Sequence, residues 1–170
     1  INNWRDAWGI KDFPFYFVQI APYIYTGLDS SNSVLLREAQ AKSLSVPKTG
    51  MVVTLDIATG MNIPPPYKVE VGESLANLAL ANDYGLKVPF QGPGYKSMVR
   101  DGNTIKIQFE NIGTGFTSKS EYLSEFEIAG KDGKYVKAVA KIVNNEVWVS
   151  APKVTEPESV RYCWRNGAVG

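Results

Sequence analysis

Histidine is the residue type that most limits the chemistry of this chain, because the 170-residue sequence contains none. Histidine is the commonest general base and the commonest ligand of transition metals in proteins. A Ser-His-Asp triad, a Cys-His pair and a zinc site built on histidine are therefore all excluded within this sequence. The one cysteine, Cys163, lies in a stretch of strand composition and is predicted to be a buried structural residue. We expect no metal and no cofactor.

Asp56 is the first candidate for a catalytic group. It lies near the end of the apolar run 51–57, which reads as a buried parallel strand, and α/β sheets bind their ligands at the carboxyl ends of such strands. An aspartate that caps the following loop is an equally good interpretation. The loop 60–68 contains Asn62 and the prolines 64–66, so its stiff backbone could shape a pocket or simply link two elements.

Four further residues are candidates for substrate binding: Gln19, Tyr23, Arg37 and Gln40. Gln19 is a polar residue inside an aromatic strand, so it needs a hydrogen-bond partner, which is either a substrate or a neighbouring backbone group. Tyr23 belongs to an aromatic-rich region, and aromatic rings bind sugars although they more often form core. Arg37 and Gln40 lie on an expected helix, where a solvated helix face is the alternative.

The elements that position these residues alternate between strand and helix. The sequence predicts a strand over 13–21, a helix over 34–44 with Ser33 as its N-cap, a strand over 51–57 and a helix over 71–85. This order predicts a parallel sheet. Since two parallel strands do not form a stable sheet by themselves, we expect this half to belong to a larger domain. A second chain or a homodimer would then cover the edge of strand 13–21.

The second half of the chain has a different pattern, with short strands separated by turns. Turn signals such as Asp101-Gly102 and Asn144-Asn145 divide it. The six stretches of strand composition are 96–100, 104–110, 125–129, 134–143, 146–150 and 159–164. This spacing is typical of an antiparallel β-sandwich. The sequence thus predicts an α/β domain over 1–89 and a sandwich-like domain over 90–170.

Composition excludes several classes of partner. The formal net charge is +1 and charges of both signs are mixed along the chain, so neither nucleic acid nor an anionic membrane is expected. No apolar stretch approaches the roughly 20 residues that a membrane helix needs. The chain does not begin with Met and its first residues do not form a signal peptide, so we expect a mature form or a cut piece.

Several motifs in this sequence resemble those of one enzyme family. They read FPFYFVQIAPY at 13–23, LREAQ at 36–40 and TGMVVTLDI at 49–57, with further matches in the second half such as FEIAG at 126–130 and VRY at 160–162. The matches occur in order over nearly the whole chain. Together they resemble the C-terminal portion of the sialate O-acetylesterases, carbohydrate esterases of the SGNH-hydrolase type.

The resemblance implies a fold, a reaction and a location. The fold would be the C-terminal part of a flavodoxin-like, three-layer αβα SGNH domain, followed by the antiparallel domain. The reaction would be hydrolysis of an O-acetyl ester on sialic acid or a related sugar, by a serine nucleophile that lies upstream in the family and a histidine base just before the last helix. Family members would be secreted, periplasmic or lysosomal.

The sequence departs from the family pattern at the base. The family wording is close to Ile-His-Pro, whereas this chain reads Ile63-Pro64-Pro65, so Pro64 stands where the histidine is expected. Proline has no titratable side chain, and losing a triad member typically costs orders of magnitude in rate. Asp56 and Asn62 are the nearest polar residues, with no claim that either substitutes. We expect this chain by itself to be inactive, and the alternative is a non-catalytic glycan-binding or structural fragment.

Overall fold

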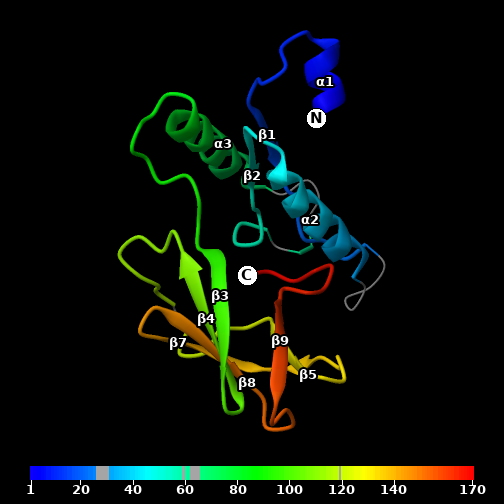
Figure 1. Cartoon of the computed structure of the whole chain (residues 1–170), viewed down its shortest axis with the longest axis vertical. Coiled ribbons are helices and arrows are strands. Elements are labelled where there is room, and N and C mark those ends of the chain that lie inside the picture. Colours follow the sequence, from blue (N-terminus) through cyan, green and yellow to red (C-terminus); the bar gives the residue numbers. More distant parts are fainter. Residues whose placement is uncertain (26–30, 59, 62–65, 119) are drawn as a thin grey trace. The chain divides into compact units, whose positions relative to one another are not determined.

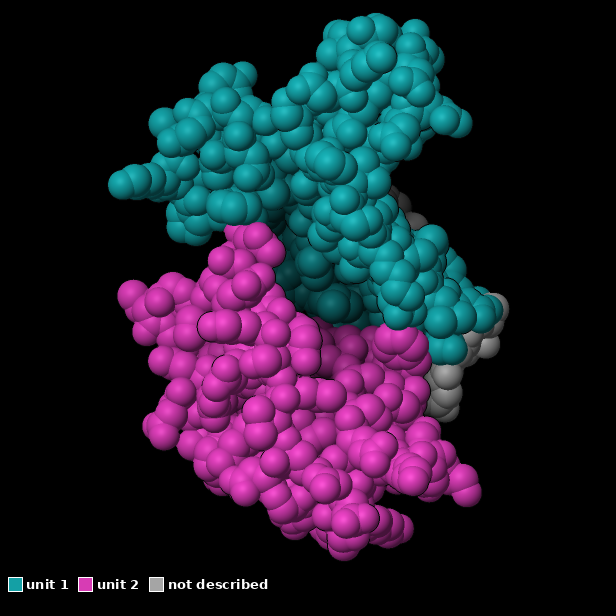
Figure 2. Space-filling model, viewed as in Figure 1, with its two compact units in different colours: residues 1–90, 165–169 teal, residues 91–164, 170 magenta. Residues whose placement is uncertain are grey.

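A computed structural model of the chain describes residues 1–25, 31–58, 60–61, 66–118 and 120–170. The chain divides into two compact units (Figure 2): unit 1 comprises residues 1–90 and 165–169, and unit 2 comprises residues 91–164 and 170. The sequence predicted a second domain over 90–170, whereas the segment 165–169 clusters with unit 1. Within the described ranges, no helix is long and apolar enough to cross a membrane.

Unit 1 is a mixed α/β unit. Its elements are α1 (Asn2–Ala7), β1 (Phe15–Val18), α2 (Asn32–Lys42), the 3-10 turn η1 (Ser43–Ser45), β2 (Thr49–Val52) and α3 (Lys68–Asn82) (Figure 1). β1 and β2 pair in parallel, from Phe15 opposite Thr49 to Val18 opposite Val52. The predicted order of strand, helix, strand and helix and the parallel pairing are therefore confirmed.

Both parallel strands are shorter than the sequence predicts. β1 covers 15–18 of the expected 13–21, and β2 ends at Val52, after which the chain turns over residues 55–57. The apolar run of β1 was expected to be buried on both faces, but its residues are half-exposed and Val18 is 37% exposed. The described residues add no third strand to this sheet, and a two-stranded sheet cannot bury both faces of a strand.

Helix α2 begins two residues earlier than expected. Its first residue is Asn32 and its N-cap position is Ser31, so the prediction that Ser33 is the N-cap is wrong. Ser33 lies inside the first turn, where its backbone N–H and its hydroxyl both donate to Asn166 Oδ1. Ser33 therefore bonds to a residue near the far end of the chain and does not cap its own helix.

Unit 2 contains two antiparallel sheets. One has the strand order β3-β4-β8-β7 and the other β6-β5-β9. The bounds are β3 Gly94–Asp101, β4 Thr104–Glu110, β5 Phe126–Gly130, β6 Val136–Lys137, β7 Val139–Val143, β8 Glu146–Ser150 and β9 Pro157–Tyr162. Alternate residues of both sheets share one core, which includes Ile105 and Ile107 of β4, Ile128 of β5 and Val149 of β8. This arrangement is a β-sandwich.

The structure confirms two hairpins that turn signals predicted in the second half of the chain, and it corrects one predicted strand. Asp101 pairs with Thr104 around Gly102, and β7 pairs with β8 around Asn144 and Asn145, which both have positive φ as the tight hairpin turn requires. The single strand expected over 134–143 is split into β6 and β7, which belong to different sheets. At the junction the N–H of Ala138 donates to the carbonyl of Phe126. The chain changes sheets at this point, which keeps the apolar residues of both sheets in one core.

Candidate functional site

The carboxyl end of β1 brings three of the predicted substrate-binding residues together. Gln19 is buried, its N–H donates to Val52 O at 2.9 Å, and its Nε2 donates to Arg37 O at 3.0 Å. One residue further, the N–H of Ile20 donates to Gln40 Oε1 at 2.9 Å. Gln19 and Gln40 therefore fasten helix α2 to the end of the parallel strands through backbone groups, which satisfies the buried polar atoms.

Arg37 is the charged residue at the centre of this arrangement. It is only 5% exposed, so the solvated helix face considered from the sequence is wrong for this residue. Its Nη1 donates to Ser33 Oγ at 3.2 Å and its Nη2 to Arg165 O at 3.0 Å. A buried guanidinium needs several acceptors to offset the loss of water, and here it obtains them from α2 and from the C-terminal segment 165–169.

Asn166 joins the C-terminal segment to two other parts of unit 1. Its Oδ1 accepts from Ser33 N at 2.9 Å and from Ser33 Oγ at 2.7 Å, while its backbone carbonyl accepts from Tyr23 N at 3.0 Å. Sequence reasoning missed Asn166 and the role of Ser33. The two residues are 133 positions apart, and no local pattern in the sequence indicates such a contact.

Two buried polar atoms at this end of unit 1, Thr54 Oγ1 and Asn166 Nδ2, have no hydrogen-bond partner among the described residues. Buried polar groups in folded proteins are almost always paired. Each of these atoms is therefore open to a partner outside the described residues, such as a water molecule or another part of the chain.

The remaining predicted site residues are only partly placed. Asp56 lies exposed in the turn 55–57 that follows β2, and no hydrogen bond or ion pair joins it to a described residue. Asn62 and Pro64 lie outside the described residues. Tyr23 packs edge-on against Tyr25, with 5.1 Å between the ring centroids and 74° between the planes. Its backbone is fixed by Asn166, and its hydroxyl makes no hydrogen bond to the described part of the chain.

A polar hollow lies at the opposite, amino end of the two parallel strands. It has a volume of about 480 Å³ and is lined by Tyr16, Lys48, Thr49, Asn82 and Asp83. The hydroxyl of Tyr16 donates to Asp83 Oδ2 at 2.8 Å. Burial, together with the hydrogen bond to Asp83 and its charge, raises the pKa of Tyr16 to about 12, so the phenol stays protonated at neutral pH. This hollow is at the wrong end of the strands for an α/β active site, and its tyrosine is not an activated group.

The described residues hold no complete acid–base pair for ester hydrolysis. Asp56 has no base or nucleophile bonded to it, the chain has no histidine, and no group of three metal-ligating side chains occurs in the described ranges. The hydrogen bonds described above connect the carboxyl ends of β1 and β2, helix α2 and the C-terminal segment 165–169.

Comparison with solved structures finds proteins of similar structure. No protein-family model matches the chain, and no curated protein matches its sequence. The chain is similar in structure to a carbohydrate acetylesterase from Xanthomonas citri, with a TM-score of 0.83 and 32% sequence identity. The alignment covers 98% of this chain and 40% of that protein, so this chain spans well under half of the length of its structural neighbour. This likeness supports the predicted relationship to carbohydrate esterases.

Proposed function

We propose that this chain is the C-terminal portion of a carbohydrate O-acetylesterase of the SGNH-hydrolase type. The observation that supports the proposal most strongly is the likeness to the Xanthomonas citri carbohydrate acetylesterase, which extends over 98% of this chain at 32% identity. The parallel pairing of β1 and β2 fits the last strands of a flavodoxin-like sheet. The motifs at 13–23, 36–40 and 49–57 resemble those of sialate O-acetylesterases, so the finer proposal is an O-acetylated sialic acid or a related sugar as substrate.

The proposed role of the chain within the esterase is to position groups. Hydrolysis of an acetyl ester needs a hydroxyl nucleophile, a base that removes its proton and donors for the oxyanion. Gln19, Arg37 and Gln40 are engaged with backbone and side-chain groups of unit 1, so we assign them a positioning function. Tyr23 is left as the candidate for contact with a sugar, because its ring is half-exposed at this end of unit 1.

The general base is the group that the proposed reaction requires and that this chain does not supply. The resemblance places the proton acceptor at residue 64, and proline there can accept no proton. The sequence has no histidine, and no nucleophile is hydrogen-bonded to a base among the described residues, so the proposal is that the chain by itself forms no acyl-enzyme intermediate. A chain that retains sugar affinity without turnover is the second candidate function, which the absence of histidine favours.

The experiment is hydrolysis of p-nitrophenyl acetate and of O-acetylated sialic acid by this chain and by its Pro64→His variant. We expect no turnover from either protein, because restoring the base does not supply the nucleophile. Clear turnover by the unmodified chain would contradict the proposal and would require a serine activated by a carboxylate or a lysine. Binding of the O-acetylated sugar without turnover, measured by calorimetry, would favour the second candidate.

A further inference from the structure

Strand β3 forms one edge of the four-stranded sheet of unit 2, and its inner face is exposed. Met98 lies opposite Ile107 of β4, and Arg100 lies opposite Ile105. Directly paired residues point to the same face of a sheet, so both side chains point towards the inside of the sandwich. Ile105 and Ile107 are buried there, whereas Met98 is 42% exposed and Arg100 is also exposed. The sandwich is therefore open on the side of β3.

A hollow lies on this open side, between β3 and β9, which is an edge strand of the other sheet (Figure 1). It has a volume of about 280 Å³ and is lined by Met98, Arg100, Ile105, Pro157 and Glu158. The register of β9 against β5 shifts here and leaves Glu158 as an extra residue between two paired positions. A β-bulge of this kind re-aims a side chain and is common beside functional sites. The bulge therefore accounts for a carboxylate at the wall of the hollow.

Arg100 and Glu158 are the charged residues that line the hollow. No hydrogen bond or ion pair joins the side chain of either one to a described residue. By contrast, Arg161 and Glu127 of the same unit form two hydrogen bonds with each other, at 2.8 and 3.2 Å. A guanidinium has donors only and a carboxylate has acceptors only. The hollow therefore combines donors from β3 and acceptors from β9, none of which bonds to a described residue, with the buried apolar side chains at its base.

We propose that this hollow binds one ring of a neutral sugar. A hydroxyl group both donates and accepts, so hydroxyls on neighbouring ring carbons satisfy Arg100 and Glu158 together. An anion would be repelled by Glu158 and a cation by Arg100, which leaves an uncharged ligand as the best match. Met98, Ile105 and Pro157 suit the C–H face of a ring, and the volume is close to the lower end of the roughly 300–1,000 Å³ of ligand pockets. The choice of a sugar rests on the proposed function, because a carbohydrate esterase acts on glycans.

Arg100 and Glu158 can be changed separately, because both side chains are exposed. Arg100→Met keeps an unbranched side chain but removes every guanidinium donor, so it should weaken binding of a neutral sugar at least tenfold. Glu158→Gln keeps the shape of the side chain and removes the charge that repels anions, so this variant should gain affinity for an acidic sugar. Lys141→Met is the matched control, because it removes a positive charge from the same sheet at a position opposite Trp148, away from the hollow.

The experiment titrates the isotope-labelled chain at neutral pH with glucose, galactose and mannose, and with the uronic acid and the amino sugar of each, and follows the NMR signals. We expect at least one neutral sugar to shift the amide signals of Met98 and Glu158 and to bind at least tenfold more tightly than its two charged counterparts. Lys141→Met should bind this sugar like the parent chain, and Arg100→Met at least tenfold more weakly. Glu158→Gln should bind the uronic acid more tightly than the parent chain does. Circular dichroism identifies a variant that fails to fold, and the other variant then decides the result.

The outcomes separate this site from the proposed function, because binding is measured without any esterase assay. Absence of binding by every neutral sugar, equal binding by folded Arg100→Met, or tighter binding of a uronic acid by the parent chain would overturn the site. Shifts confined to Tyr23 and its neighbours in unit 1 would also overturn it and would leave the proposed function intact. Binding that is lost in Arg100→Met supports the site even if no acetyl ester is hydrolysed, and such inactivity bears on the proposed function alone.

Discussion

Ser33 donates two hydrogen bonds to one oxygen of Asn166, from its backbone N–H at 2.9 Å and from its hydroxyl at 2.7 Å. Both residues are buried, at 5% and 0% exposure, and they join the first turn of α2 to the C-terminal segment 165–169. Because the same asparagine also accepts from Tyr23 N through its carbonyl, one residue holds two distant parts of unit 1 in place.

Replacing Asn166 by alanine should therefore destabilise unit 1. The substitution leaves the hydroxyl and the N–H of Ser33 buried without their acceptor, which costs about 2 kcal/mol in the free energy of unfolding. Urea denaturation followed by circular dichroism measures the change. Asn32→Ala is the matched control, because Asn32 is an exposed neighbour in α2, and it should change stability by less than about 0.5 kcal/mol. Equal stability of the two variants would contradict the role of Asn166.

Gly50 is expected to tolerate no side chain. A Cβ atom added there would lie 2.7 Å from Cδ1 of the Tyr16 ring and 3.2 Å from a methyl of Leu78. Gly50→Ala should destabilise the chain by about 1–3 kcal/mol, since β2 and its neighbours would have to move apart. Gly72→Ala provides the opposite case, because no atom lies within 4 Å and α3 should gain about 0.5–1 kcal/mol. Thermal melting of both variants in parallel tests the sign of each effect.

Ionisation of the Tyr16 phenol should lower the free energy of unfolding at alkaline pH. Its pKa is raised from 10.0 to about 12, first by burial and then by the hydrogen bond to Asp83. The folded chain therefore keeps the phenolic proton between pH 10 and 12 while the unfolded chain loses it, so the stabilising contribution is complete below pH 10 and is lost as pH rises through 12. Ultraviolet titration of the phenolate against the Tyr16→Phe variant measures the pKa. The titration step that is present in the parent chain and absent from Tyr16→Phe belongs to Tyr16. A midpoint near pH 10 for this step would contradict the raised pKa.

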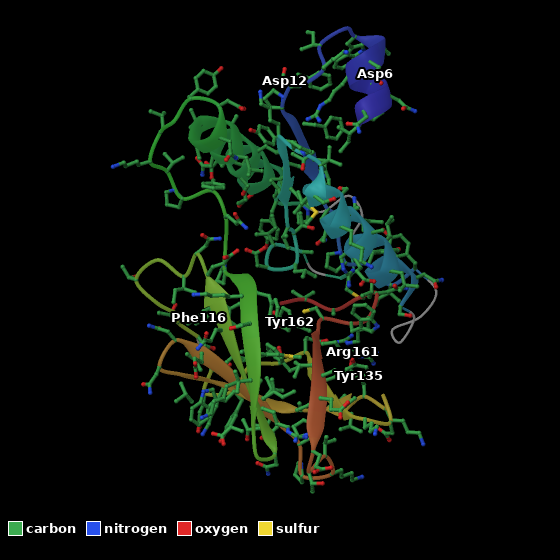
Figure 3. The ribbon with its side chains drawn as sticks, in the orientation of Figure 1. Asp6, Asp12, Phe116, Tyr135, Arg161 and Tyr162 are labelled. Carbon is green, nitrogen blue, oxygen red and sulfur yellow. The ribbon has the colours of Figure 1, made fainter. Side chains whose placement is uncertain are left out.

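Arg161 in unit 2 should contribute through both an ion pair and a ring contact (Figure 3). Its Nε and Nη2 donate to the two carboxylate oxygens of Glu127 at 2.8 and 3.2 Å, and its guanidinium carbon lies 4.1 Å from the Tyr135 ring centroid. Both charged side chains are less than a third exposed. A double-mutant cycle with Arg161→Met and Glu127→Gln should give a coupling energy of about 1 kcal/mol. A coupling near zero would mean that solvent screens the pair.

The local parts of the fold were predictable because they depend on local chemistry. Asp101-Gly102 and Asn144-Asn145 specify tight turns, so the two hairpins of unit 2 could be predicted from the sequence. The parallel pairing of β1 with β2 followed from apolar strands alternating with helices. The split of 134–143 at Ala138 could not be predicted, because the residues on both sides of it have strand composition and only the two sheets decide where the chain crosses.

The candidate site was harder to predict, because its contacts depend on residues far apart in the chain. Gln19, Arg37 and Gln40 stood out as polar residues in apolar or helical surroundings, and the structure places them together at the end of β1. Their partners are backbone groups, which no side-chain pattern reveals. Asn166 had no distinguishing signal, since an asparagine before a glycine near the end of a chain usually reads as a turn.

The central claim is tested most directly by a chimera in which this chain replaces the 40% of the Xanthomonas citri acetylesterase that it matches. We expect the chimera to fold but to hydrolyse p-nitrophenyl acetate at least a hundredfold more slowly than the intact enzyme, because residue 64 supplies no base. The same chimera with Pro64→His should hydrolyse this ester at least tenfold faster than the chimera with proline at residue 64. A folded chimera that remains inactive with histidine at this position would contradict the assignment of this chain to an acetylesterase.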